Sequence, residues 1–221
     1  MSVATIPNYL EAIAHIPSGK SLVASGVAWE DYEQLLEDLG PSSSVRVFYD
    51  HGRMEIMSPL SRHEKPAQLI ARLITTLSDA LDIDVESMGA TTLKKKLADA
   101  GAEPDESFYV QNAAAIIGHL DLTLETDPPP DIVVESDHTS SSLDKFPIYA
   151  ALGVPEIWRI SGLAVCIWLL DGGVYRMSAV SRAFPFLPVE TLNEFLAMGL
   201  AEGGRKMARA FREWLKIHHQ L

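Results

Sequence analysis

The segment PPPDIVVESDHTSSSLDKF, residues 128–146, places a short apolar run between two acidic residues. Asp131 follows the prolines and Glu135 comes directly after the apolar run 132–134, a pattern that predicts a buried strand. Residues four apart on a strand share a face, with their Cα atoms about 13 Å apart at ~3.3 Å per residue. Asp131 and Glu135 are therefore too far apart to share one metal ion, and Glu135 needs a partner from another segment.

A second acidic segment, EPDESFYVQN at residues 103–112, supplies this partner if it pairs antiparallel with residues 131–136. The start of the first strand then faces the end of the second, which places Asp105 beside Glu135. Neighbouring strands lie ~4.8 Å apart, close enough for two carboxylates to bind one divalent cation. Residues 113–130 leave room for other chain routes, so the pattern allows this pairing without requiring it.

The far ends of the two segments meet under the same pairing. Gln111 or Asn112 then lies near Asp131. Because Asp131 follows three prolines, we interpret it as the structural start of its strand.

Helical and strand-like segments alternate along the rest of the chain. Apolar residues recur at helical spacing in 28–40, which Gly40 ends, and in 58–83, where Pro66 suits the first turn. Residues 1–27 show little periodicity and are predicted to be an irregular arm. Strands are predicted at 45–58 (a hairpin), 85–89, 91–96, 106–112, 131–136, 155–161, 164–170 and 173–180, and helices at 146–152, 191–200 and 205–219. This order predicts an α/β fold with a mixed β-sheet flanked by helices.

The composition limits the ways in which the chain can bind nucleic acid. With 18 basic and 30 acidic residues its net charge is −12, and bulk attraction to phosphates depends on an excess of Lys and Arg. Any phosphate chemistry must therefore be local. We find no signal-peptide pattern and no apolar stretch near the ~20 residues of a membrane span, so we expect a cytoplasmic protein that does not bind membranes.

Six segments, in order along the chain, resemble the Uma-two family of restriction-endonuclease-like proteins, in the PD-(D/E)XK phosphodiesterase superfamily. They are GVAWEDYEQLLEDL (26–39), GRMEIMSPLSRHE (52–64), TTLKKK (91–96), EPDESFYVQN (103–112), PPPDIVVESDHTSSSLDKFPIYAALGVPEIWRI (128–160) and SRAFPFLP (181–188). The resemblance implies a restriction-endonuclease-like core over residues 28–190, with residues 1–27 as an N-terminal arm and 191–221 as a helical extension packed on the same domain. It also implies an endonuclease that hydrolyses nucleic-acid phosphodiester bonds with a metal ion, with DNA as the expected substrate and a homodimer as the expected assembly.

The resemblance assigns roles to three acidic residues. Asp105 corresponds to the aspartate of the PD motif, Glu135 to the acidic residue of the following strand, and Glu64 to an acidic residue of the preceding helix. These residues are expected to hold Mg²⁺ or Mn²⁺, with Glu64 bound directly or through water, because hard oxygen ligands suit these ions. At a helix start, Glu64 also has a simpler explanation as a favourable partner of the helix dipole.

The catalytic lysine of the superfamily does not stand at its usual position. Two residues after Glu135 this chain has Asp137, and the resemblance points instead to Lys145, at the start of the next predicted helix. Lys94, Lys95 and Lys96 are rivals for this role. Lys94, Lys96 and His138 are the candidate substrate-binding residues. The displaced lysine and the acidity of the chain leave a second interpretation open, a weak or inactive relative that binds nucleic acid or protein.

Overall fold

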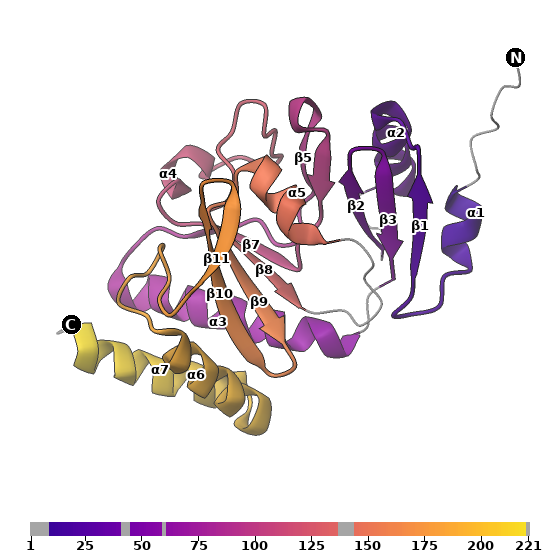
Figure 1. The fold of residues 1–221 in the computed structure, drawn as a ribbon. Helices are drawn as coiled ribbons and strands as arrows, with labels where there is room; N and C mark the ends of the chain where they lie inside the picture. Colours follow the sequence, from indigo (N-terminus) through magenta and orange to yellow (C-terminus); the bar gives the residue numbers. More distant parts are fainter. Residues whose placement is uncertain (1–8, 41–44, 59–60, 137–143, 220–221) are drawn as a thin grey trace, which may run out of the picture.

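Two β-sheets lie side by side in the structure of the protein (Figure 1). The structure is a computed structural model that describes residues 9–40, 45–58, 61–136 and 144–219, except for the side chains of 61–64 and 219. The N-terminal sheet has the order β1 (Ser21–Ser25), β3 (Arg53–Met57), β2 (Arg46–Asp50), β6 (Ala100–Ala102), β5 (Leu93–Lys95), with every pair antiparallel. The central sheet has the order β11 (Val174–Ser178), β10 (Ala164–Asp171), β9 (Glu156–Ser161), β8 (Ile132–Ser136), β7 (Glu106–Tyr109), β4 (Glu86–Ser87). Only β8 and β9 are parallel, so the central sheet is the mixed one.

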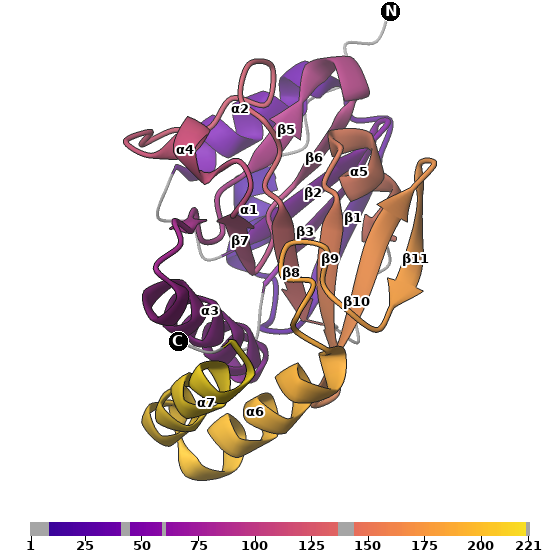
Figure 2. The same cartoon turned by 90° about the vertical axis from the view of Figure 1, so that its left-hand side faces the viewer.

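Helices cover both faces of the central sheet. One face is buried by three long helices that stack beneath it in Figure 2, namely α3 (Ser61–Leu81), α6 (Val189–Glu202) and α7 (Gly204–His219). The other face packs against α5 (Lys145–Leu152), which also contacts β2, β5 and β6 of the N-terminal sheet. α2 (Trp29–Leu39) covers the N-terminal sheet, and the short helices are α1 (Tyr9–Ala14), α4 (Ala113–Ile116) and the 3₁₀ turn η1 (Lys96–Ala98). The predicted α/β fold with helices flanking a mixed sheet is confirmed, with a separate antiparallel sheet added to it.

None of the helices in the described part of the chain is long and apolar enough to cross a lipid bilayer.

β8 is buried on both faces, and its alternation decides where Glu135 points. Ile132 and Val134 pack with the long helices, whereas Val133 packs on the opposite face with α5. Because side chains alternate along a strand, Glu135 shares the face of Val133. The carboxylate of Glu135 therefore faces α5 and the N-terminal sheet.

The predicted hairpin at 45–58 is confirmed as β2 and β3, joined at His51 and Gly52. Both residues have positive φ angles, 46° and 79°, in the left-handed region that two-residue hairpin turns require. Glycine adopts this conformation without a steric penalty, which explains why the Asp-His-Gly sequence turns the chain here.

Two expectations about the elements are wrong, and one strand is shorter than predicted. Residues 1–27 are not an irregular arm throughout, because α1 and β1 form there and β1 pairs with β3 as an edge strand. Pro66 is the sixth residue of α3, so it lies beyond the first turn. The strand predicted at 91–96 ends at Lys95, where η1 and a left-handed residue, Asp99 at φ 47°, turn the chain back into β6.

Candidate active site

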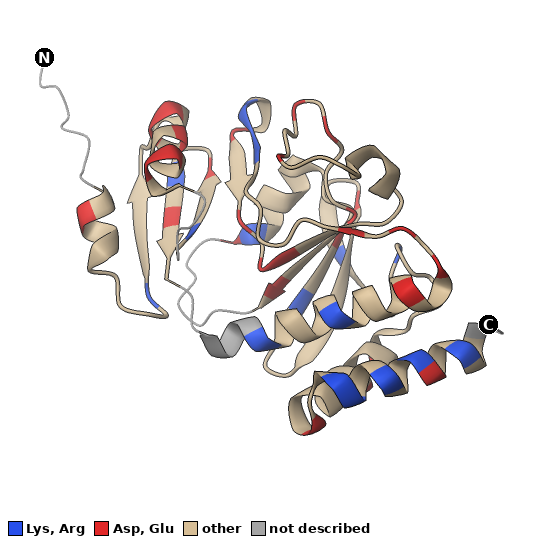
Figure 3. Cartoon of the chain, turned by 180° about the vertical axis from the view of Figure 1, so that it is seen from behind, with Lys and Arg blue, Asp and Glu red and all other residues tan. Residues whose placement is uncertain are grey.

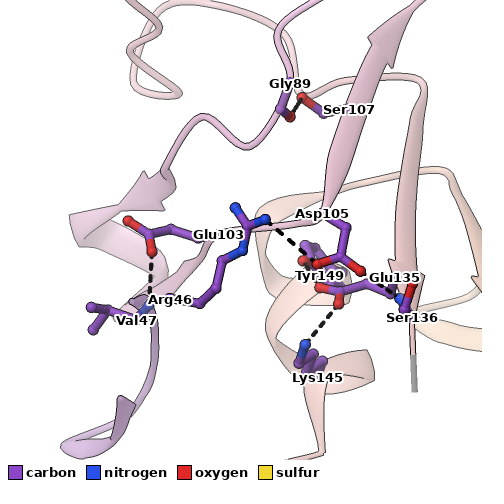
Figure 4. Close-up of polar contacts among 10 residues, drawn as sticks. All are labelled: Arg46, Val47, Gly89, Glu103, Asp105, Ser107, Glu135, Ser136, Lys145 and Tyr149. Atoms are coloured by element: carbon purple, nitrogen blue, oxygen red, sulfur yellow. Dashed lines mark hydrogen bonds and ion pairs between the residues drawn. The ribbon is translucent and has the colours of Figure 1, made fainter. Parts of the chain in front are cut away.

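The two strands that carry the candidate carboxylates are antiparallel, and this part of the prediction is confirmed. Glu106 lies opposite Val134, which places the next pair, Asp105 and Glu135, opposite one another. The N–H of Asp105 donates to the carbonyl oxygen of Val134 at 3.1 Å, which continues the ladder to this position. Figure 4 shows the two carboxylates lying beside each other.

Asp131 closes the other end of the same strand pair. Its Oδ2 accepts from the backbone N–H groups of Val110 at 2.7 Å and Asn112 at 3.0 Å, and its Oδ1 accepts from the Asn112 side chain at 2.9 Å. Gln111 points elsewhere and donates to the carbonyl of Ala183 at 3.1 Å. Asn112 is thus the neighbour of Asp131, and Asp131 anchors its strand as interpreted from the sequence.

Asp105 lies where the two sheets meet. Its side chain is 6% exposed, and its Oδ2 accepts from the N–H of Ser136 at 2.8 Å. Its Oδ1 lies 3.7 Å from Nη2 of Arg46, which comes from β2 of the N-terminal sheet (Figure 4). This separation is longer than a hydrogen bond, so the guanidinium supplies charge to Asp105 without holding it tightly.

Glu135 is held by two side chains from α5. Nζ of Lys145 donates to Oε2 at 2.7 Å, and the hydroxyl of Tyr149 donates to Oε1. Residues four apart in a helix share a face, which explains how α5 presents both donors to one carboxylate. The first and fifth residues of α5 thereby fix both oxygens of Glu135.

Lys145 is placed at the carboxylate by the start of its helix. Asp144 is the N-cap of α5, and its side chain accepts from the N–H of Phe146 at 3.1 Å. The lysine side chain is only 13% exposed, and its Nζ lies 4.0 Å from the centre of the Phe48 ring. A cation over an aromatic face in a dry setting is favourable, so Phe48 helps to keep the ammonium group at the site.

Opposing influences act on Glu135, and the pKa of its carboxyl is raised on balance. Burial raises the pKa of the Glu135 carboxyl, because its charged form loses solvation, and the nearby charge of Asp105 raises this pKa further. The Lys145 ammonium and the Tyr149 hydroxyl act in the opposite direction and lower it. Burial also holds the pKa of Tyr149 well above its ordinary value, with Glu135 as a second cause. Tyr149 therefore acts as a hydrogen-bond donor and not as an anion.

Two adjacent buried carboxylates fit a divalent cation in their chemistry and charge. The charge of Asp105 raises the cost of ionising Glu135, and a cation shared between the two carboxylates removes that cost. Carboxylate oxygens also have spare lone pairs beyond those used by Lys145 and Ser136. No cluster of three or more carboxylate, imidazole or thiolate groups suited to a metal is found among the described residues, which leave out the side chain of Glu64. A metal ion held between Asp105 and Glu135 would therefore need at least one further ligand from outside the described side chains.

The predicted substrate-binding lysines lie apart from this pair of carboxylates. Nζ of Lys94 donates to Glu33 at 2.7 Å, and Nζ of Lys96 donates to Glu30 at 2.9 Å. Both acceptors belong to α2, so these lysines fasten α2 to the end of the N-terminal sheet. Either lysine would have to leave a carboxylate partner before it bound a phosphate.

Two predicted site residues cannot be placed. The backbone of Glu64 belongs to the first turn of α3, but its side chain is outside the described set. His138 falls in 137–143, outside the described residues. A metal-ligand role for Glu64 and a substrate contact for His138 remain predictions.

The sequence alone did not reveal Tyr149 and Arg46. Tyr149 carried a usable signal, because it stands four residues after Lys145 in the same predicted helix and must share its face. Arg46 carried none, since it lies in a hairpin distant in sequence and reaches Asp105 only when the two sheets meet.

Comparison with known proteins gives a family match over most of the chain. The model of the Uma2 family, described as "Putative restriction endonuclease", matches residues 29–201. A crystal structure of a "putative nuclease belonging to DUF820" from Anabaena variabilis aligns at a TM-score of 0.48 and 13% identity, covering 76% of this chain and 97% of that one, which is too distant to bear on the fold or the site. No protein of curated function matches the chain. The family match confirms the resemblance described from the sequence.

Proposed function

The chain belongs to the Uma2 family, described as restriction-endonuclease-like, and we propose from its candidate site that it is a metal-dependent endonuclease acting on DNA. One observation supports this proposal above the others. Two strands distant in sequence bring Asp105 and Glu135 together in a buried site, with the ammonium of Lys145 on Glu135. A buried pair of like charges costs stability, so its presence favours a chemical role over a structural one.

Each residue of the site has a distinct task in the proposed reaction. Asp105 and Glu135 hold Mg²⁺ or Mn²⁺, with Glu64 as the proposed third ligand, directly or through water. When bound, such an ion polarises a phosphoryl oxygen and lowers the pKa of a bound water molecule. Lys145 stabilises the charge that grows on the phosphate or orients the attacking water. Tyr149 keeps Glu135 in position through its hydrogen bond to Oε1, and Arg46 balances the charge of Asp105.

A second candidate function is favoured by the way in which the carboxylates are already neutralised. Lys145 contacts Glu135 and Arg46 lies near Asp105, so two cations face two anions without any metal. Such a set suits a weak or inactive relative that binds nucleic acid or protein without cutting it. Under either function we propose a cytoplasmic location and a homodimer.

Cleavage of supercoiled plasmid DNA in the presence of Mn²⁺ tests the proposal. We expect the parent to nick the plasmid. Asp105→Asn and Glu135→Gln should each slow nicking at least about 100-fold, because loss of a proposed metal ligand should cost no less than the loss of a residue that only supports a ligand. Lys145→Ala is expected to slow it about 10²–10³-fold without abolishing metal binding.

Glu106→Gln is the matched control. Glu106 is the neighbour of Asp105 and, like Glu135, has a pKa raised by burial, yet it pairs across from Val134 and points to the opposite face of the strand. This variant should cut like the parent. A parent that binds DNA without cutting it would favour the second candidate function over the endonuclease. Equal activity in all four variants would show that the chemistry takes place at another site.

A further inference from the structure

An open cleft that includes Arg46 in its wall is poorly suited to a phosphate backbone. It has a volume of about 840 Å³ and lies between α2 and β2 on one side and residues 88–94 on the other. Its lining includes the acidic residues Glu33, Glu37, Glu103 and Asp121, against the cations Arg46 and Lys94. A polyanion would be repelled here, so a nucleic-acid substrate needs a different contact surface.

A row of cations runs along the exposed side of α7. Arg205, Arg209, Arg212 and Lys216 follow one another at intervals of four, three and four residues, and all four are exposed. At 1.5 Å per residue the row is about 16 Å long. The opposite side of the helix is buried against α3 and α6 through Met207, Phe211 and Leu215, which fixes the orientation of the row.

α3 extends this row into a surface. Its exposed side carries Lys65 and Arg72. The Arg72 side chain lies against the start of α7, since a Cβ added at Gly204 would be 3.2 Å from Cδ of Arg72. Figure 3 shows bands of Lys and Arg along both helices on the same side of the molecule. We call the set Lys65, Arg72, Arg205, Arg209, Arg212 and Lys216 the basic face.

Most cations of the basic face are not neutralised by the protein itself. Lys216 pairs with Glu213 at 3.0 Å, but the other five have no carboxylate within 4.0 Å among the described residues. This is unexpected in a chain with 30 acidic and only 18 basic residues. On α2, by contrast, the acidic residues Glu30 and Glu33 are paired with lysines. Free guanidinium groups in an acidic protein indicate a surface kept open for an anion.

We propose that the basic face binds the phosphate backbone of a nucleic-acid duplex. This inference rests on the proposed function for its choice of partner. Arginine forks match phosphate oxygens, and phosphates of one strand follow at 3.4 Å along the axis, so a row of about 16 Å spans about five of them. An acidic patch of a second copy is a poorer partner, because the acids of α2 are already partly neutralised by Lys94 and Lys96.

The basic face lies on the other side of the central sheet from the carboxylate of Glu135, which faces α5. α3 packs directly against β7 and β8, the strands that bring Asp105 and Glu135 together. A duplex bound along α3 and α7 is therefore held on the helical layer that packs behind these two strands. The basic face supplies affinity without contributing to the chemistry.

Binding of a labelled DNA duplex of about 30 base pairs, measured in EDTA between about 50 and 200 mM salt, tests the inference without any cleavage. The double variant Arg209→Gln/Arg212→Gln should weaken binding at least about 5-fold at low salt and reduce the slope of log affinity against log salt by between about 1 and 2. The matched control is Lys20→Gln/Arg176→Gln, which removes the same charge from two exposed positions away from the basic face. Lys20 directly precedes β1, and Arg176 lies in β11. The control should bind within about 2-fold of the parent.

Three results would overturn the inference. They are equal affinities for the two double variants, a parent that does not bind the duplex at low salt, and a sedimentation change in Arg209→Gln/Arg212→Gln with unchanged DNA affinity, which would identify a second copy as the partner. EDTA removes divalent metal ions, so this assay measures binding without cleavage. The plasmid assay and this assay can therefore fail independently. A parent that binds through the basic face but does not cut would contradict only the endonuclease.

Discussion

At the scale of single residues, Glu135 is the point on which the candidate site depends. Its strand fixes its direction, Lys145 and Tyr149 fix its two oxygens, and burial, with the charges of Lys145 and Asp105, sets its electrostatic environment. Strand spacing allowed Asp105 and Glu135 to meet if their strands paired antiparallel, and the family resemblance selected that arrangement among those the sequence left open. The contribution of Arg46 did not follow, because it depends on how two sheets meet.

Tyr149→Phe tests the buried bond to Glu135. Removing the hydroxyl leaves a buried carboxylate oxygen without its donor, so we expect the free energy of unfolding to fall by about 1.5–3 kcal/mol. Urea denaturation measures the change. The control is Tyr175→Phe, which removes a buried hydroxyl that donates to the neutral carbonyl of Val154 at 2.6 Å and should cost about 0.5–1.5 kcal/mol. A Tyr149 variant no less stable than the Tyr175 variant would contradict the assigned bond.

At the scale of elements, a second buried carboxylate connects β9 to the segment that leads into α6. Oε2 of Glu156 accepts from the N–H groups of Arg182 and Ala183 at 2.8 and 3.0 Å, and its Oε1 accepts from the Trp158 indole at 2.5 Å. Burial is the largest influence and raises the pKa of Glu156 above its ordinary value of 4.5. A sequence read by hydrophobic period gives no sign of this bond, because Glu156 looks like an ordinary strand-end acid.

Glu156→Gln is expected to reveal this shift as a dependence of stability on pH. A carboxyl whose pKa is raised in the folded protein contributes stability below about pH 4.5 and loses it as the pH rises through the folded value. The free energy of unfolding of the parent, relative to the Gln variant, should therefore decrease as the pH rises above 4.5. Denaturation curves of both proteins at several pH values above 4.5 measure this difference in the free energy of unfolding. The contributions of the other titrating groups cancel, because both proteins contain them. A difference that grows with pH would mean that the hydrogen bonds to the carboxylate outweigh its burial.

At the scale of the whole molecule, the sequence predicted most helices and strands of the central layer but not the division into two sheets. Long apolar periods identified α3, α6 and α7, and short apolar runs identified β7 to β11. β1 and β6 were missed because their sequences, SLVAS and AGA, carry little apolar signal of their own. β1 forms by pairing with the outer edge of β3, and β6 forms by pairing with the outer edge of β2. These edges exist only once the β2–β3 hairpin has formed.

Phe211→Ala tests whether α7 belongs to the main core. Phe211 is fully buried, with its ring centre 4.9 Å from that of Phe195 and 5.9 Å from that of Trp214. Its loss leaves a cavity between α7 and α6, and we expect a destabilisation of about 3–5 kcal/mol in a single cooperative transition. Ile217→Ala, at a residue 76% exposed on the same helix, should change stability by less than about 0.5 kcal/mol. Separate transitions for α7 and the rest would show that the helix is an independent appendage.

Titration of the purified protein with Mn²⁺, followed by the electron paramagnetic resonance of the free ion, tests the central claim most directly. We expect the parent to bind Mn²⁺ at or below about millimolar concentration, Asp105→Asn and Glu135→Gln each to weaken binding at least about 10-fold, and Glu106→Gln to bind like the parent. Binding that is the same in the parent and in both site variants, or absent from the parent, would contradict a metal site shared by Asp105 and Glu135.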